Sequence, residues 1–518
     1  MKTLELNYAQ RRSLYQTPAD QVYTITVAIE PPAGTAQRTI RAALTELVAT
    51  HEALRSRLVI GEDGRMLQEV ADDVAEARDR IEVDVRQIGH ADEIPDTAVD
   101  DPPTVDPRIH AARCTLYTRD GSVRHVILTV SHLFADGMSQ RVLYEDLDAL
   151  LRGKPVRGAA HRRQASDYAE PRLAETTREN TDFWKARLAG APRSCTFGGY
   201  VRGGEETLRI ARRADDRVHG AVMDAARGLG ASPFTVWATA LSALVSVYTG
   251  QDRQVFRSVS ANRFEPADEH AVANLAQPVY IRLDGRRRDT LEERAELVFE
   301  AALEAHTRGM FDATELLAWL DSPEIRNGVA FRPAFDLNFL VHDDGMPAPV
   351  GDYIQRRRVV PARATADLAV QVQQGPTTHV RVTAGEPVWT ARAAGDIAAD
   401  LLEVLRFVRD HPAMPVPDLP VARLRPASGT RRGHRSGIGI DDDAQLALLT
   451  GVAGVRSASW TAQPGADGLR VLAVVETEGA VTADALARSY ARRQPWFSGA
   501  VVPDQVEARL PKTAGAKG

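Results

Sequence analysis

The sequence predicts a mixed α/β (α+β) fold with more than one hydrophobic core. Its 518 residues exceed the length at which a single core usually stops growing. Apolar and polar residues alternate over 22–29, and a 3.6-residue apolar period follows over 39–48, which is the pattern of a strand followed by a helix. Strand and helix patterns recur in the second half, and their mixture in both halves predicts this architecture.

The next strand of the first half is expected to end at a reactive position. Residues 124–130 are mainly strand-forming and lead directly into Ser131–Gly137. A helix is predicted from about Met138 to Leu151. The end of a strand that opens through a glycine-containing turn is a favourable place for a reactive side chain.

A polar surface connection is expected between the two halves. Residues 156–164 and 168–180 are polar, and a short helix is predicted over 182–188. The second half then shows a strongly apolar helix over 233–248, which Gly250 ends. The later predicted elements are strands near 254–260, 277–283 and 334–341 and a helix near 397–410.

A compact third piece is expected after these two halves. Residues 425–440 are rich in Gly, Arg and Ser and predict a linker. Beyond them, strands over 455–461 and 469–475 and a helix over 483–493 predict a small βαβ-like unit. The predicted domains are the N-terminal half at 1–165, the second half at 166–424, the linker at 425–440 and the C-terminal unit at 441–518.

Composition argues against several classes of function. The net charge of −6, with basic and acidic residues interspersed, argues against a nucleic-acid partner. No apolar run reaches the roughly 20 residues of a membrane span, so we expect a cytoplasmic protein without a membrane partner. Cys114 and Cys195 are too few and too far apart for a disulfide framework or a zinc site. No metal or redox cofactor is therefore expected.

His132 is the first candidate for chemistry. It follows a hydrophobic strand, so its imidazole could face a cleft, and an ordinary histidine pKa near 6.5 suits proton transfer at neutral pH. A histidine in such a place can also be a structural residue with satisfied hydrogen bonds. Asp136, four residues later, is expected to pair with an arginine and hold the loop rather than to act as a second acid.

The sequence around His132 resembles a known motif. Ser131–Gly137 is similar to the His-His-x-x-x-Asp-Gly motif of nonribosomal peptide synthetase condensation domains, which belong to the chloramphenicol acetyltransferase-like superfamily. The resemblance covers about residues 1–420. Other segments that resemble family motifs, in chain order, are Leu6–Arg12, His51–Leu58, Asp167–Ala169, Phe183–Pro192, Ser232–Phe234, Tyr248–Gln251, Ser260–Arg263 and Asn274–Leu283.

This resemblance implies two acetyltransferase-like subdomains in a V-shaped pseudo-dimer, with a small C-terminal α+β subdomain added. A tunnel between the halves would admit an acyl donor from one side and an acceptor from the other, with His132 in the middle. The catalytic motif residues that the resemblance implies are His132, Asp136 and Gly137. The implied protein is a stand-alone condensation enzyme of natural product biosynthesis.

The same resemblance implies the reactants. The donor would be an acyl thioester on the phosphopantetheine arm of a carrier protein in trans, or an acyl-CoA, and this thioester is a substrate rather than a cofactor. The acceptor would be a small-molecule amine or alcohol, and the product an amide or an ester.

The chain departs from the family pattern at several positions. Ser131 stands in place of the first motif histidine, which the resemblance implies is supportive rather than proton-transferring. Thr50 stands where the family usually has an arginine before His-Glu. The partner of Asp136 is therefore expected to be Arg263 or Arg55, with Arg263 favoured.

Some further residues have two interpretations each. Asn338 and Asp336 could face the tunnel, or could belong to an ordinary alternating strand. Arg286–Arg288 and Arg356–Arg358 could be solvated faces or could attract the phosphate of a phosphopantetheine arm. The altered segment Ala273–Gln277 is expected to reshape the acceptor channel.

The C-terminal piece and the function of the whole chain each have two possible interpretations. Residues 441–518 resemble the small C-terminal subdomain of adenylating enzymes, and Lys517 stands where those enzymes place a lysine that contacts the adenylate. Because we find no phosphate-binding loop in this sequence, a unit kept for packing or for contact with a partner is favoured over a catalytic Lys517. For the whole chain, the alternative to an acyltransferase is a non-catalytic recruitment protein that uses the condensation fold as a docking surface.

Overall fold

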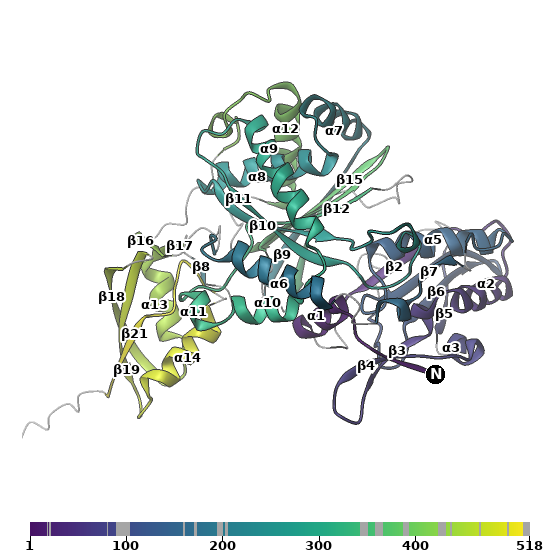
Figure 1. Cartoon of the computed structure of the whole chain (residues 1–518), viewed down its shortest axis with the longest axis horizontal. Helices are drawn as coiled ribbons and strands as arrows, with labels where there is room; N and C mark the ends of the chain where they lie inside the picture. Colours follow the sequence, from purple (N-terminus) through teal and green to yellow (C-terminus); the bar gives the residue numbers. More distant parts are fainter. Residues whose placement is uncertain are drawn as a thin grey trace, which may run out of the picture. The chain divides into compact units, whose positions relative to one another are not determined.

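The computed structural model of the protein divides into two compact units. It describes residues 1–17, 19, 22–79, 81–89, 104–158, 161–169, 174–193, 200–201, 206–341, 351–357, 366–386, 393–422, 431–435, 438–465, 468–494 and 497–510. Unit 1 comprises Met1–Asp182, Ser260–Gln277 and Gly309–Glu315, and unit 2 comprises Phe183–Val259, Pro278–Arg308 and Leu316–Gly518. Both units combine sheets with helices, which confirms the predicted mixed α/β class (Figure 1).

The main sheet of unit 1 ends in the segment that the sequence singled out. Its strand order is β2-β7-β6-β5 within the described residues. The strand bounds are β2 Thr24–Ile29, β5 Glu82–Gln87, β6 Ala112–Arg119 and β7 Ser122–Ser131. Strand β2 runs antiparallel to β7, and its first residue Thr24 pairs with Ser131, the last residue of β7. A central strand of the sheet therefore delivers the chain directly to His132.

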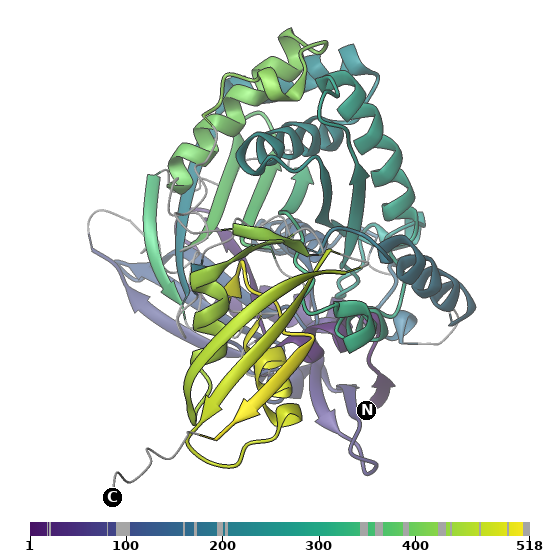
Figure 2. The ribbon, with the colours of Figure 1, turned by 90° about the vertical axis from the view of Figure 1, so that its left-hand side faces the viewer.

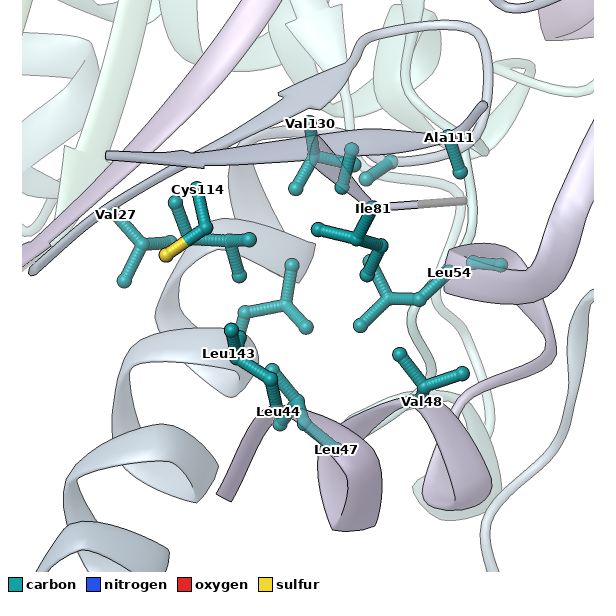
Figure 3. Packing of buried hydrophobic residues seen from close by; sticks show 14 of the residues in the cluster. Val27, Leu44, Leu47, Val48, Leu54, Ile81, Ala111, Cys114, Val130 and Leu143 are labelled. Carbon is teal, nitrogen blue, oxygen red and sulfur yellow. The ribbon is translucent and has the colours of Figure 1, made fainter. Parts of the chain in front are cut away.

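Helices α2 (Gln37–Thr50) and α5 (Gly137–Leu151) pack together beside this sheet. Figure 3 shows Leu44 and Leu143 from the two helices pointing toward Val27 and Val130 of the sheet. These side chains are buried with the thiol of Cys114, whose pKa burial raises to about 12. The thiol therefore fills space in the core.

The remaining elements of unit 1 include a smaller sheet. A three-stranded sheet within the described residues has the order β1-β4-β3. The bounds are β1 Lys2–Glu5, α1 Tyr8–Gln16, η2 Glu52–Arg55, β3 Ser56–Ile60, β4 Met66–Val70, α3 Val74–Asp79, η4 Ala165–Tyr168 and η6 Pro266–Asp268. Asn7 caps α1 by accepting the Gln10 N–H at 3.0 Å, which fixes where this helix begins.

Unit 2 is built on one large sheet. Its strand order is β11-β10-β12-β14-β15-β9-β13 across the described residues, with β10, β12 and β14 parallel and β14, β15, β9 and β13 antiparallel. The bounds are β9 Glu206–Asp215, β10 Arg253–Ser260, β11 Gln277–Asp284, β12 Asp336–Val341, β13 Gly351–Arg357, β14 Leu368–Gln374 and β15 Thr378–Glu386.

A group of helices covers this sheet (Figure 1). They are α7 Asp216–Leu229, α8 Pro233–Thr249, α9 Leu291–Thr307 and α12 Ala394–Asp410. The unit also contains the short helices α11 Pro323–Arg326 and η7 Val416–Asp418 and the later part of α10 Ala313–Leu320. Helix α8 is buried along almost its whole length, which explains its apolar sequence. Ser232 caps its start, and Gly250 ends it with a φ of 71°, a left-handed conformation that glycine adopts at little cost.

No single helix in the described ranges has the length and apolarity to cross a membrane. Helices α7 and α8 together have the length and composition of a membrane span, but the chain bends by 95° at the break between them.

The polar connection between the halves differs from the prediction. Helix α6 spans Ala174–Leu188 and is longer than the predicted helix over 182–188. Its added turns are polar, but they are held by specific contacts rather than by an apolar face. Asn180 Nδ2 donates to the Met310 carbonyl at 2.8 Å, and the Asp312 N–H donates to Thr181 Oγ1 at 2.9 Å. Such contacts leave no periodic signal in the sequence.

The C-terminal piece contains the two predicted strands and the predicted helix, but a third strand that was not predicted, β21, completes its βαβ arrangement. Strands β18 and β19 form an antiparallel hairpin, and β19 pairs in parallel with β21. Figure 2 turns this piece, coloured yellow-green to yellow, toward the viewer. The bounds are β16 Arg431–Arg435, β17 Ile438–Asp441, α13 Asp442–Thr450, β18 Val455–Gly465, β19 Gly468–Thr477, α14 Ala483–Arg493, β20 Phe497–Ser498 and β21 Gln505–Arg509.

The described part of the predicted linker is ordered into strands. β16 and β17 pair antiparallel, where an irregular linker over 425–440 was expected from the Gly, Arg and Ser content. The physical reason lies in a long-range contact: the Arg435 side chain is almost buried and forms two hydrogen bonds with Asp504, at 2.6 and 3.0 Å. Arg435 Nη2 also donates to Asn327 Oδ1 at 2.7 Å.

The core of the C-terminal piece also includes a residue from a distant part of unit 2. Val329 is fully buried in the same cluster as Trp460 and Tyr490. Its neighbours are held by main-chain contacts, because the Val502 N–H donates to the Gly328 carbonyl at 2.9 Å. Strand β20 pairs with β8 (Tyr200–Val201). The C-terminal piece is thus built into unit 2 rather than tethered to it.

We expect the substitution Arg435→Ala to lower the free energy of unfolding by about 2–4 kcal/mol. It removes the almost buried guanidinium that binds both Asp504 and Asn327, and breaking a pair with a buried partner is costly. The matched control Arg456→Ala changes an exposed arginine of β18 and should cost less than about 0.5 kcal/mol. Urea denaturation of both variants checks this, and equal effects would contradict the contribution assigned to Arg435.

Candidate active site

The candidate active site begins where β7 ends. The Ser131 N–H donates to the Ala111 carbonyl at 2.9 Å, and the His132 N–H donates to the Tyr23 carbonyl at 2.7 Å. The Ser131 side chain is fully buried, and its Oγ accepts the Leu133 N–H at 3.3 Å. The main chain on both sides of His132 is therefore fixed by neighbouring segments of the fold.

His132 itself is half-buried. Burial lowers the pKa of its imidazole below 6.5, the Asp136 charge and a hydrogen bond of the ring with the main chain of His132 oppose this shift, and the charge of Arg12 reinforces it. Among the described residues no other side chain forms a hydrogen bond with the His132 ring. The ring is consequently neutral at neutral pH and free to accept a proton from a bound molecule.

Asp136 is the buried anchor of the loop. It is 0% exposed, and it caps α5 by accepting the Ser139 N–H at 3.0 Å. Its Oδ2 also accepts the main-chain N–H groups of Leu275 at 2.9 Å and Ala276 at 3.1 Å. Arg263 binds both carboxylate oxygens, at 2.8 and 2.9 Å. Gly137 follows directly as the first residue of α5, so the carboxylate, the helix start and the distant segment 273–276 are joined at one point.

The pKa of Asp136 reflects these contacts. Burial alone would raise it, but the charge and hydrogen bonds of Arg263 and the main-chain donors outweigh burial and hold the pKa below its ordinary value. Asp136 is therefore a permanent carboxylate near neutral pH. Such a group positions the loop and does not donate a proton.

Ser139 is a site residue that the sequence reasoning missed. Its Oγ lies 2.9 Å from both Asp136 Oδ1 and the Ala273 carbonyl oxygen, and it accepts the Ala273 N–H at 3.1 Å. It is fully buried. An aspartate at a helix N-cap accepts the N–H of the second or third helical residue, and this rule could have identified Ser139 as a contact of Asp136.

Of the two arginines considered as partners of Asp136, only Arg263 makes the contact. Arg55 Nη1 instead donates to the carbonyls of Val48 at 3.3 Å and Ala49 at 2.9 Å. These carbonyls belong to the last turn of α2, where a cation is favourable. Arg55 thus stabilises a helix end.

His51 and Glu52 have structural contacts. His51 Nε2 lies 2.9 Å from Asp146 Oδ2, and both side chains are buried. Asp146 also pairs with Arg162. Glu52 accepts from Lys2 Nζ at 2.8 Å. This His-Glu segment therefore ties α2 to α5 and to the small sheet.

Asn338 and Asp336 lie in unit 2 on β12. Asp336 pairs with Arg257, although burial raises the pKa of its carboxyl, and Asn338 is half-buried. Arg286–Arg288 are exposed. The side chains of Arg356–Arg358, together with Cys195 and Lys517, lie outside the described residues. No group of three or more His, Cys, Asp or Glu side chains with metal-binding geometry occurs in the part of the chain that was described.

A tight contact at Gly309 supports the Arg263 segment. Asn262, with a φ of 51°, donates from Nδ2 to the carbonyls of Leu275 at 2.9 Å and Gly309 at 3.1 Å. A Cβ atom at residue 309 would lie 2.2 Å from Asn262 Oδ1 and 2.5 Å from Ser260 Oγ. Residue 309 must therefore be glycine for Asn262 to keep this position beside Arg263.

We expect Gly309→Ala to destabilise the fold by about 1–3 kcal/mol, because the added methyl group overpacks a buried site. The double variant Gly309→Ala/Asn262→Gly removes the clashing amide and should regain part of the loss. As a control, Gly220→Ala places a Cβ in open space on α7 and should be neutral or stabilising. Thermal unfolding checks all three variants, and an unperturbed Gly309→Ala protein would contradict the contact.

Comparisons with known proteins agree with this arrangement. Residues 1–423 match the family model described as "Condensation domain". The chain is 27% identical over 239 residues to surfactin synthase subunit 1 of Bacillus subtilis (strain 168), covering 44% of this chain and 6% of that protein. Across the curated relatives, the matched region spans only 4% to 9% of the relative's length.

Solved structures share the fold. The first condensation domain of the calcium-dependent antibiotic synthetase, in complex with a substrate analogue, has a TM-score of 0.61 and 20% identity, covering 81% of this chain and 100% of that one. The X-domain from teicoplanin biosynthesis has a TM-score of 0.63 and 21% identity, covering 82% and 98%. The same X-domain has also been solved in complex with OxyB.

Proposed function

Because the chain belongs to the condensation-domain family, we propose that it is an acyltransferase that forms an amide or ester bond. The proposed donor is an acyl thioester on a carrier protein supplied in trans or on coenzyme A, and the acceptor is a small-molecule amine or alcohol. The proposed setting is nonribosomal peptide or related natural product biosynthesis. The thioester is a substrate, and the proposed reaction uses no cofactor.

The observation that carries this proposal is the neutral, half-buried His132 beside the fixed Asp136 loop. In the proposed step the acceptor nitrogen or oxygen attacks the thioester carbonyl carbon while His132 takes its proton. The carbon–sulfur bond then breaks, and the proton passes to the leaving thiolate. Holding both reactants beside His132 supplies part of the rate enhancement, because positioning lowers a bimolecular barrier.

The other motif residues are proposed to support His132. Asp136 and Gly137 set the loop geometry, and Arg263 keeps the Asp136 carboxylate charged. Ser131 is buried and hydrogen-bonded within the turn, which suits a supporting role at the position of the family's first histidine. Asn338 of β12 is proposed to contact a reactant.

A second candidate is a non-catalytic recruitment protein. Two observations favour it: Ser131 replaces a motif histidine, and the fold is similar to an X-domain that was solved in complex with another protein. The two candidates differ in one result. An enzyme transfers the acyl group, whereas a recruitment protein binds a partner without transfer.

The test is intact-mass spectrometry of candidate acyl-carrier thioesters incubated with amines and alcohols. Loss of the acyl group from the carrier, with a matching gain on the acceptor, supports the acyltransferase. Tight carrier binding without any transfer favours the recruitment protein.

The pH dependence of the reaction gives a separate prediction. Because burial lowers the pKa of His132 below 6.5, its base form predominates at pH 7. We expect kcat/KM to be flat between about pH 7 and 8 and to fall as pH drops through the lowered pKa, where the imidazole gains a proton. A pH profile of kcat/KM checks this. A rate that still rises through pH 7 to 8 would argue against a neutral His132 as the base.

For residues 441–518 we propose a structural role in a unit related to the small C-terminal subdomain of adenylating enzymes. The supporting observations are the β19, α14, β21 arrangement and the buried contacts of Val329 and Arg435. Lys517 is not proposed to act in chemistry. Contact with a partner protein is the alternative for this unit, and loss of product formation on its removal, with the rest still folded, would favour that alternative.

A further inference from the structure

Helix α9 has a second apolar side that the fold leaves exposed. One side of the helix is buried in unit 2 through Leu291, Arg294, Ala295, Val298, Ala301, Ala302 and Ala305. Phe299 and Leu303 lie on another side, one turn apart, and are 42% and 59% exposed. A helix at the surface of a protein usually has one apolar side, which packs against the core. The packing of α9 therefore does not account for Phe299 and Leu303.

The exposed apolar side continues into three aromatic rings. His306 lies one turn after Leu303 on the same side of α9, and its ring meets the ring of Phe234 with 5.3 Å between the centroids. Phe234 is in the first turn of the neighbouring helix α8 (Figure 1). Its ring centroid lies 6.1 Å from that of Phe339 on β12. Each of the three rings is half-buried, so part of each ring is accessible.

Val341 extends this surface along β12. It stands two residues after Phe339, which places both side chains on the same face of the strand, and it is 64% exposed. The apolar patch consists of Phe234, Phe299, Leu303, His306, Phe339 and Val341. Single exposed apolar residues are normal on a protein surface, but a patch that several elements build together marks an interaction site. The apolar patch spans α8, α9 and β12, so it belongs to the second kind.

The charges beside the apolar patch are negative. Glu296 and Glu300 are exposed on α9, and each lies one turn from an exposed apolar residue of the patch. Neither carboxylate forms a hydrogen bond or an ion pair with any residue that the structure describes, whereas Glu304 pairs with Arg187 at 3.5 Å. Like charges four residues apart destabilise a helix. Helix α9 thus keeps two unfavourable features side by side, which are exposed apolar surface and uncompensated negative charge.

His306 adds no charge to the apolar patch near neutral pH. Burial lowers the pKa of its imidazole below 6.5, so the neutral ring predominates at pH 7. The negative charges of the two glutamates are therefore not offset from within the patch.

These charges indicate what covers the apolar patch. A positively charged partner would bury the apolar side chains and also pair with both glutamates, which removes both unfavourable features at once. A second copy of this chain, related by the usual two-fold symmetry, would bring the same glutamates of two copies together. A membrane surface of anionic lipids attracts basic segments, and it would repel these glutamates.

We propose that the apolar patch docks a partner protein through a segment that carries apolar side chains flanked by lysine or arginine. In its simplest form such a segment is a basic amphipathic helix. The proposal does not depend on acyl transfer, because no residue of the patch is assigned to the proposed chemistry. It adds a protein contact on unit 2 that acyl transfer by itself does not require.

The test uses two fluorescently labelled amphipathic peptides of equal length. Both contain leucine in the same helical pattern, and their polar positions are lysine in one peptide and glutamate in the other. We expect fluorescence anisotropy to show the lysine peptide binding the wild-type protein at least about ten times more tightly than the glutamate peptide. No binding of the lysine peptide at about 1 mM would overturn the proposal.

The double variant Phe299→Gln/Leu303→Gln tests the apolar part of the site. We expect it to bind the lysine peptide about ten times more weakly or worse, since buried aromatic and aliphatic anchors contribute most to such contacts. Its melting temperature should match that of the wild type, because both side chains are exposed. The control Met223→Gln changes a 36% exposed methionine of α7 and should leave binding unchanged. Equal binding by the double variant and the wild type would contradict the proposal.

The double variant Glu296→Lys/Glu300→Lys tests the charges. We expect it to lose the lysine peptide and to gain binding of the glutamate peptide. The matched control is Glu175→Lys/Glu179→Lys, which reverses another exposed pair at the same spacing on α6. It changes the net charge of the protein equally and should keep the wild-type preference. An equal loss in the control would mean that the peptide senses only the overall charge, and the docking site would then be wrong.

Two further results would assign the apolar patch to another occupant. A wild-type dimer that becomes a monomer in Phe299→Gln/Leu303→Gln, measured by light scattering, would identify a second copy of this chain. A raised KM for the acyl donor in the same variant, with unchanged peptide binding, would identify a reactant. The docking site and the proposed function also fail separately: a wild type that transfers no acyl group but binds the lysine peptide through the patch retains the docking site alone.

Discussion

Replacing His132 by alanine is expected to lower kcat for acyl transfer by about 100-fold or more, the scale of a lost general base. The imidazole at the end of β7 is the proposed general base, and no other side chain among the described residues hydrogen-bonds to its ring. Its removal should therefore affect chemistry far more than folding. Intact-mass or continuous assays of thioester consumption, alongside thermal unfolding, measure both effects.

The control for this variant is His125→Ala. His125 lies on the same strand β7, and its ring faces Glu30 at 3.8 Å. Its replacement should leave kcat within about twofold, because it has no part in the proposed chemistry. If the His132 and His125 variants transfer at the wild-type rate, His132 serves only to shape the turn, and the proposed mechanism is wrong.

Arg263→Ala should produce the largest loss of stability at the site, about 3–5 kcal/mol at neutral pH. The Asp136 carboxylate is 0% exposed, and removing the arginine leaves this buried charge without its cation. Arg263→Lys keeps a positive charge but cannot bind both oxygens in the same fork, so a smaller loss is expected. Urea denaturation at pH 7 provides the comparison.

The pH dependence of this loss has a definite sign. In the wild type the folded-state pKa of Asp136 lies below its ordinary value, so its contribution to stability is present above that value and is lost as pH falls through the folded pKa. Without Arg263, burial raises the pKa instead, and protonation at low pH relieves the buried charge. The difference between variant and wild type should thus shrink as pH falls from 7 toward 4.

Arg57→Ala is the matched control for Arg263→Ala. Arg57 pairs with Glu69 across β3 and β4, with both side chains partly exposed. Pairs of this kind contribute roughly 0–1 kcal/mol, and the loss should change little with pH over the same interval. A loss for Arg263→Ala that matches this control in size would mean that Asp136 does not depend on its arginine.

Elements that are stabilised by their own residues could be predicted from the sequence, whereas elements that depend on distant contacts could not. Helix α8 was predicted almost to the residue, because its apolar face, its capping serine and Gly250 all lie within the element. The first turns of α6 and the strands β16 and β17 were not predicted. They depend on Asn180 and Arg435, whose partners lie 130 and 69 residues away in the chain.

The candidate site shows the same division. His132 and Asp136 were recognised from one local motif, and the choice of Arg263 over Arg55 came from the family resemblance. The contact that decides between these arginines joins residues 127 positions apart, so no spacing rule could reveal it. Ser139 carried a local capping signal that was overlooked.

The place of Val329 in the C-terminal core has a consequence for the order of folding. Asn327, two residues before Val329, contacts Arg435 across 108 residues of chain, and Ala330 contacts Gln494 across 164. During translation, Val329 therefore leaves the ribosome long before the residues of the core that encloses it. Its side chain stays exposed until those residues have been made. Contacts this far apart in sequence form slowly, because a long loop must close first. Folding of the newly made chain should accordingly benefit from chaperones or growth conditions that shield this apolar segment until the C-terminal strands have been made.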